Sequence, residues 1–235
     1  PPVHYGYPDP DRDFTEVVQV FGLSPSTAYA YDLEIEGQRY GPYTLRTAPA
    51  ADAPGSLRLA FGSCTDQDEQ PIFTAVEDWG PDVFLFLGDN HYANTDDLSS
   101  LRQHYRWAHE REHRAALMSR AVTLAGWDDH DFVGNNTDGT EPGRDVALRA
   151  FSEYWANPAY GADGIPGIFY EARWGDVSLF VVDNRYWRAV EAEDSMLGAA
   201  QEAWLLDALA ARPVTKGAAS APATKSRRVE FSPSL

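Results

Sequence analysis

Hydrophobic and polar positions alternate in the first 48 residues, which is the pattern of half-buried strands. Residues 15–20 and residues 29–35 both alternate with a period of two. Between them, residues 22–29 read Gly-Leu-Ser-Pro-Ser-Thr-Ala-Tyr, a composition typical of turns. We therefore expect a small β unit at residues 1–48. A linker rich in Ala, Pro and Gly should follow it at residues 49–55.

From residue 56 onward, apolar runs alternate with segments of helical periodicity. Strands are expected at residues 57–61, 83–87 and 121–125, with a hairpin at 169–174 and 177–182. Helices are expected at residues 71–79, 96–118, 143–155 and 199–211. The run 83–87 is apolar throughout, as in strands that are buried on both faces. This order predicts an α/β layered domain at residues 56–211, in which ligands gather at the carboxyl ends of the strands.

The charge of the chain narrows the possible partners. The formal net charge of -17 argues against nucleic acid as a main partner, because binding to phosphate backbones needs Lys and Arg.

The sequence contains no apolar run long enough to span a membrane. Its first residues lack the basic and apolar regions of a signal peptide, so we expect no signal peptide in this chain.

The last segment, residues 212–235, has a different composition. It is rich in Ala, Ser, Thr and Pro and has no periodic apolar positions, so we expect it to be disordered. From residue 213 onward its charged residues are Lys216, Lys225, Arg227, Arg228 and Glu230. This basic balance leaves a binding tail as an alternative.

Polar side chains follow each of the first three strands of the predicted α/β domain. Cys64 follows the first strand, Asp89 and Tyr92 follow the second, and Asp129 and His130 follow the third. Carboxylates gathered in one cleft repel each other unless a cation compensates, and a metal pair would serve phosphoester hydrolysis. His130 is suited to donate a proton to a substrate. Plainer interpretations stay open, with Cys64 as a buried apolar residue and Tyr92 as a packing residue.

A second group of histidines lies on the predicted helix at residues 96–118. His104, His109 and His113 follow the spacing of a helix, which by itself permits a zinc site. The same helix carries many charged residues. We therefore favour a solvated helix face over a metal site at these positions.

Three motifs occur in a fixed order: Gly62-Ser63-Cys64, Gly88-Asp89-x-x-Tyr92 and Trp127-Asp128-Asp129-His130-Asp131. In this order they resemble the metallophosphatases of the alkaline phosphatase D (PhoD-like) family. Further matches lie at residues 138–145, 153–158, 183–186 and 196–198, and the resemblance spans about residues 15–210. It implies a metallophosphoesterase-like sheet with flanking helices. The turn at residues 22–29 resembles that of fibronectin type III domains, which implies part of a β-sandwich before the sheet.

The resemblance implies a metal-dependent phosphoester hydrolase, an alkaline phosphatase or phosphodiesterase that uses a metal-activated hydroxide. Cys64, Asp89, Tyr92 and Asp129 would bind metal, with Asp89 as the bridge between two ions. The implied catalytic residues are His130, Asp129 and Arg185, and the implied substrate-binding residues are Asn90, Asn135 and Arg185. The family commonly uses iron with calcium, and zinc, manganese, magnesium or cobalt are alternatives. Small phosphoesters would be the substrates, and the location would be secreted or periplasmic.

The chain departs from the family pattern after its last strong motif. The family carries a later Gly-Asp-x-His segment with further metal ligands, whereas all six histidines of this chain lie at or before position 130. We therefore expect a C-terminally incomplete core with an exposed sheet edge, through which copies of the chain could self-associate. The alternative function is a catalytically inactive or weakly active remnant that acts as a binding or structural module.

Overall fold

The computed structural model describes residues 3–66, 68–188 and 196–212. Its N-terminal part contains a short 3-10 helix, η1 (Pro10–Arg12), and an antiparallel hairpin of β1 (Ala28–Ile35) and β2 (Gln38–Arg46). Glu36 and Gly37 join the two strands with φ of 51° and 77°. Two-residue hairpin turns favour this left-handed backbone. The hairpin is a two-stranded sheet of its own.

The predicted strand at residues 15–20 is wrong. The segment is irregular, and Val17 keeps 52% of its surface exposed. Alternation alone did not form a strand here, because no described strand pairs with this segment or buries its apolar side chains. The described residues therefore do not build the expected part of a fibronectin-like sandwich. In the turn at residues 22–29, the backbone N–H of Ser24 donates to Oη of Tyr29 at 2.8 Å.

Three parallel strands form the central sheet, in the order β3 (Leu59–Gly62), β4 (Val83–Phe86) and β5 (Val122–Ala125). Their ends are aligned, because Gly62 pairs with Phe86 and Phe86 pairs with Ala125. The prediction of these strands is confirmed, with small shifts at their ends. As a result, the carboxyl ends of all three strands lie along one edge of the sheet.

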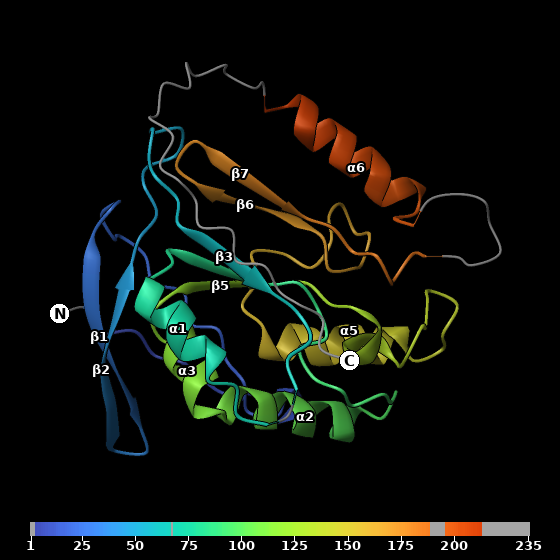
Figure 1. Ribbon diagram of the computed structural model, residues 1–235, viewed down its shortest axis with the longest axis horizontal. Coiled ribbons are helices and arrows are strands. Elements are labelled where there is room, and N and C mark those ends of the chain that lie inside the picture. Colours follow the sequence, from blue (N-terminus) through green and yellow to red (C-terminus); the bar gives the residue numbers. More distant parts are fainter. Residues whose placement is uncertain (1–2, 67, 189–195, 213–235) are drawn as a thin grey trace.

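One face of the central sheet is covered by helices α1 (Ile72–Trp79), α2 (Leu98–Glu110), α3 (Glu112–Met118) and α5 (Arg144–Tyr154) (Figure 1). The single helix predicted at residues 96–118 is wrong. Arg111 has an extended backbone, with φ -63° and ψ 127°, and separates α2 from α3. Next to it, the backbone N–H of Glu112 donates to the carboxylate of Glu69 at 3.0 Å. The break allows α3 to pack against α1.

The core between the sheet and these helices is largely aromatic. Phe86 lies near its centre, with ring centroids 4.6 Å from Phe84 and 5.0 Å from Trp155. Full burial of such a side chain contributes about 1.5–3 kcal/mol. The ring of His109 packs on Trp155 at 5.0 Å, so the solvated face predicted for the helix histidines is wrong at His109.

A second hairpin and a helix lie on the other side of the central sheet (Figure 1). The hairpin consists of β6 (Tyr170–Trp174) and β7 (Val177–Val181), as predicted, and α6 (Ala199–Ala210) lies over it. The ring of Phe169 contacts that of Trp204 at 4.9 Å. Oη of Tyr170 accepts from the N–H of Ala125 and donates to its carbonyl oxygen, at 3.1 and 2.9 Å. These bonds attach the hairpin to the end of β5.

The chain therefore has the predicted α/β fold, with a parallel sheet and flanking helices. Among the helices within the described ranges, none is long and apolar enough to cross a membrane. The proposed boundaries of the N-terminal unit, linker and α/β domain stay predictions. The predicted disordered tail lies outside the described residues, except for Arg212.

Candidate metal centre

The polar turns that follow β3 and β4 are joined through their backbones. The N–H of Cys64 donates to the carbonyl oxygen of Gly88 at 3.1 Å, and the N–H of Thr65 donates to that of Asp89 at 2.8 Å. Cys64 and Asp89 have φ of 60° and 50°, a left-handed backbone that residues other than glycine seldom adopt. This local geometry brings the side chains of Cys64 and Asp89 into contact.

The turn after β5 approaches the same place. A Cβ atom added to Gly88 would lie 2.5 Å from the backbone nitrogen of Asp128, so the close approach of these two turns depends on glycine. The turn continues into a one-turn helix, α4 (Asp129–Phe132), which the sequence did not predict. Asp128 and Asp131 form a capping box, in which each carboxylate accepts from the backbone N–H of the other. The capping box fixes the start of α4, which carries Asp129 and His130.

Asp89 lies where the three turns meet. Its Oδ2 lies 3.6 Å from Sγ of Cys64 and 3.4 Å from Oη of Tyr92. Its Oδ1 lies 3.4 Å from the backbone nitrogen of His130. The oxygen and nitrogen contacts are longer than ordinary hydrogen bonds of about 2.7–3.2 Å. Among the described residues, no Arg or Lys forms an ion pair with Asp89.

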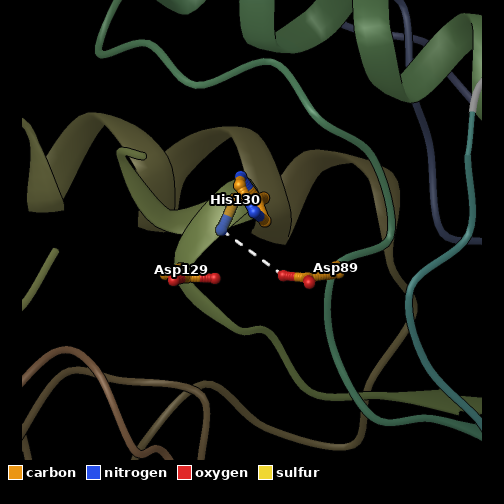
Figure 2. A group of neighbouring side chains, drawn as sticks. All are labelled: Asp89, Asp129 and His130. Atoms are coloured by element: carbon orange, nitrogen blue, oxygen red, sulfur yellow. Dashed lines mark hydrogen bonds between the residues drawn. The ribbon is translucent and has the colours of Figure 1, made fainter. Parts of the chain in front are cut away.

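Figure 2 shows the carboxylates of Asp89 and Asp129 facing each other, with His130 beside them. One possible ligand atom from each of these three residues lies within 4.8 Å of the others. The ring of His130 packs against that of Tyr92, with centroids 4.4 Å apart. The structure thus brings together the five side chains predicted to surround one cation pocket, namely Cys64, Asp89, Tyr92, Asp129 and His130.

The electrostatics of Asp89 favour a cation in this pocket. Burial raises the pKa of Asp89, against the lowering effect of His130. The carboxylates of Asp128 and Asp129 raise this pKa further. A nearby cation would oppose both effects by stabilising the charged carboxylate. The donor set therefore fits a metal ion.

The surroundings of Asp89 also shift the pKa values of Asp129 and Tyr92. Burial raises the pKa of Asp129, but a 2.6 Å hydrogen bond from the N–H of Asn136 and nearby positive charge outweigh it, so this pKa lies below its ordinary value. Burial and the contacts with Cys64 and Asp89 raise the pKa of Tyr92. Asp129 is thus ready to bind a cation as a carboxylate, whereas Tyr92 needs a cation to become a phenolate.

The three turns all lie in a region that matches a known family. A family model described as PhoD-like phosphatase matches residues 59–215. The chain belongs to the PhoD-like phosphatase family. The sequence resemblance is thereby confirmed, and the candidate metal ligands lie within the matched region.

Two solved structures share the fold of this chain. A structure described as "Structure of PhoD" superposes with a TM-score of 0.75 over 87% of this chain, at 19% identity. This chain spans about half, 49%, of that PhoD chain. The purple acid phosphatase PPD1 from yellow lupin (Lupinus luteus) seeds gives a TM-score of 0.54 at 15% identity, over 80% of this chain and 34% of its own. No curated protein matches the sequence.

Two asparagines predicted to bind substrate lie in different surroundings. Asn90 is fully buried, and its Nδ2 donates to the carbonyl oxygen of Gly126 at 2.9 Å and to Asp131 at 2.6 Å. These bonds connect the turns after β4 and β5, so they give Asn90 a supporting position. Asn135 is exposed in the turn after α4. Contact of either residue with substrate stays a prediction.

Arg185 supports the start of α4. Its Nε donates to Oδ1 of Asp128 at 2.6 Å, and its Nη1 donates to the carbonyl oxygen of Thr137 at 2.9 Å. The side chain is buried. The guanidinium is therefore bound to protein groups beside Asp129, and its role toward phosphate stays a prediction.

The sequence analysis missed Asn94. Its Oδ1 lies 2.5 Å from Nδ1 of His130, so it orients the imidazole over the pocket. Asn94 has φ of 50°, a backbone that asparagine tolerates better than most residues. Its position in a polar turn two residues after Tyr92 was the one available signal, and that signal does not single out a partner for His130.

Proposed function

We propose that this PhoD-like phosphatase is a metal-dependent phosphoester hydrolase. The observation that carries the proposal is the meeting of Cys64, Asp89, Tyr92, Asp129 and His130 in one pocket at the carboxyl edge of the sheet. Metal ions bound there would generate hydroxide from water at neutral pH and would offset the charge that develops on phosphate.

The two oxygens of Asp89 suit it to bridge two metal sites. Oδ2 faces Cys64 and Tyr92, and Oδ1 faces the start of α4, which carries Asp129. Thiolate and phenolate ligands favour iron at the first site, and carboxylate oxygens favour calcium or another divalent ion at the second. Zinc, manganese, magnesium and cobalt are the alternatives to be compared.

His130 is the proposed proton-transfer residue. Asn94 engages its Nδ1, so Nε2 is the ring nitrogen left for exchange of a proton with the substrate. We assign Asn135 and Arg185 to the phosphate oxygens, and Asn90 to support of the same subsite. Small phosphoesters as substrates, and a secreted or periplasmic location, belong to this proposal.

The test is hydrolysis of p-nitrophenyl phosphate and bis(p-nitrophenyl) phosphate by the full chain. The chain is loaded in turn with iron plus calcium, with zinc and with manganese. Asp89→Asn should lower kcat/KM by about 100-fold or more, since changes outside the ligand set already lower activity or metal affinity by about 10–100-fold. Equal rates for Asp89→Asn and the wild type would contradict the proposal.

Glu171→Gln is the matched control for Asp89→Asn. Glu171 lies on β6 and pairs with Arg212 at 2.9 Å, outside the metal pocket, so this variant should keep the wild-type rate. A wild type that binds metal but hydrolyses neither ester would favour the alternative of an inactive binding or structural module. Among the described residues β3 pairs only with β4, and self-association through this sheet edge stays a prediction.

A further inference from the structure

Arg114 is a buried cation directly behind the metal pocket. It lies on α3 and is 2% exposed, with its guanidinium carbon 4.7 Å from the ring centre of Phe86 and 5.5 Å from that of Trp155. Burial lowers the pKa of Arg114 to about 10, so the side chain is protonated at neutral pH. Within the described part of the chain, no carboxylate forms an ion pair with it. Burial of a charge without an ionic partner is unfavourable, so other interactions must hold Arg114 in place.

Those interactions lead to the turns that carry the proposed metal ligands. Nη1 of Arg114 donates to the carbonyl oxygen of Asn90 at 2.9 Å and to Oγ1 of Thr65 at 3.2 Å. Oγ1 of Thr65 then donates to the carbonyl oxygen of Asp89 at 3.1 Å. Arg114 therefore binds the turn after β4 directly, and it reaches the turn after β3 through the hydroxyl of Thr65.

Both turns need such support because their backbones are strained. Cys64 and Asp89, the two proposed ligands on these turns, have the left-handed φ described above. Residues other than glycine keep this backbone only where the surrounding structure enforces it. Arg114 can supply that constraint, because its Nη1 donates to acceptors on both turns at once.

We propose that Arg114 is the positioning residue of the metal centre, which holds the turns of Cys64 and Asp89 in the geometry that binds the cation. This inference rests on the proposed function. Among the described residues, no hydrogen bond joins Arg114 to a proposed ligand side chain, so it acts through Thr65 and Asn90. Its removal should therefore weaken metal binding in a chain that is still folded.

The experiment measures the affinity of the metal-free full chain for Mn²⁺ by isothermal titration calorimetry. Arg114→Met should raise the Kd about 10–100-fold, the range found when partners of metal ligands are removed. Arg114→Lys should give a smaller increase, because the ammonium keeps the positive charge and a hydrogen-bond donor. Thr65→Val, which removes the hydroxyl at nearly constant volume, should also raise the Kd. The double variant should then be less than additive, because both changes break the same link.

Arg102→Met is the control for loss of a half-buried arginine. Arg102 lies on α2 and pairs with Glu153 on α5 at 2.7 Å, away from the pocket. The Arg102→Met variant should have a lower thermal midpoint and an unchanged Mn²⁺ affinity. Circular dichroism establishes that each variant is folded at the titration temperature. If Arg114→Met does not fold, Thr65→Val decides the question.

The outcomes separate this inference from the proposed function. Weaker Mn²⁺ binding by folded Arg114→Met or Thr65→Val, with wild-type binding by Arg102→Met, supports the positioning role. Wild-type affinity in both the Arg114 and Thr65 variants would overturn the inference alone. A wild-type chain that binds neither Mn²⁺ nor any metal of the hydrolysis assay would overturn the proposed function and this inference with it.

Discussion

His130 has two ring nitrogens in different surroundings, since Nδ1 is bound to Asn94 and no described residue forms a hydrogen bond with Nε2. If Nε2 transfers the proton, His130→Gln should lower kcat by about 10²–10⁴-fold, the usual contribution of general acid–base catalysis. Metal affinity should stay close to that of the wild type. Steady-state kinetics with p-nitrophenyl phosphate and calorimetry with Mn²⁺ provide the two measurements.

Asn94→Ala is the control for His130→Gln. It removes the partner of Nδ1 but leaves the imidazole, so it should lower kcat less than His130→Gln does. A parallel loss of metal affinity and kcat in His130→Gln would mean that His130 is a metal ligand and not the proton-transfer residue.

The sequence predicted the members of the pocket better than the residues that hold them. Cys64, Asp89 and Asp129 each follow an apolar strand, so the sheet alone places them at one edge. Asn94 bonds to His130 across 36 residues of sequence, and Arg114 bonds to Asn90 and Thr65 across 24 and 49 residues. No local pattern encodes such pairs, because they depend on the paths of the turns.

At the scale of elements, the end of β5 is covered by side chains. Asn157 accepts from the N–H of Ala125 through Oδ1 at 3.0 Å and donates to its carbonyl oxygen through Nδ2 at 2.9 Å. Tyr170 makes the corresponding pair of bonds through its hydroxyl. The two side chains thus pair with the backbone of β5 as a neighbouring strand would.

Asn157→Ala should therefore destabilise the fold. Loss of both bonds, with partial compensation by Tyr170, should lower the free energy of unfolding by about 1–3 kcal/mol, as measured by urea denaturation. Asn157→Asp keeps the acceptor and should be less damaging. An unchanged urea midpoint in Asn157→Ala would show that Tyr170 alone is sufficient at this edge.

The wrong predictions of elements share a cause. Residues 15–20 alternate between apolar and polar residues as a strand does, but a strand also needs a neighbouring strand to pair with. The local sequence does not show whether such a neighbour is present. Residues 96–118 keep helical periodicity through Arg111, but the helix breaks there. The backbone N–H of Glu112 donates to the carboxylate of Glu69 at this break. In both segments tertiary contacts, or their absence, override the local preference.

For the whole molecule, the formal net charge of -17 implies electrostatic self-repulsion in the folded state. An increase in ionic strength from about 0.01 M to about 0.1 M shortens the screening length from about 30 Å to about 10 Å. This screening should raise the thermal midpoint by about 2–4 °C, the shift that about 1 kcal/mol produces in a chain of this size.

Differential scanning calorimetry of the metal-free chain measures this shift. Sodium chloride is compared with tetramethylammonium chloride, whose bulky cation screens charge but does not fit carboxylate sites. Similar increases with both salts indicate general screening. A thermal midpoint that is unchanged or lower in both would contradict the prediction.

Because the backbone is left-handed at Cys64 and Asp89, stability and function favour different residues at these two positions. Glycine would relieve about 1–3 kcal/mol of strain at each position, but it would delete the sulfur or the carboxylate that the pocket uses. A search for more heat-resistant variants should therefore repeatedly select glycine at positions 64 and 89 when it screens for stability alone. Selection for hydrolysis would reject the same substitutions, so these two positions keep residues that selection for stability alone would replace.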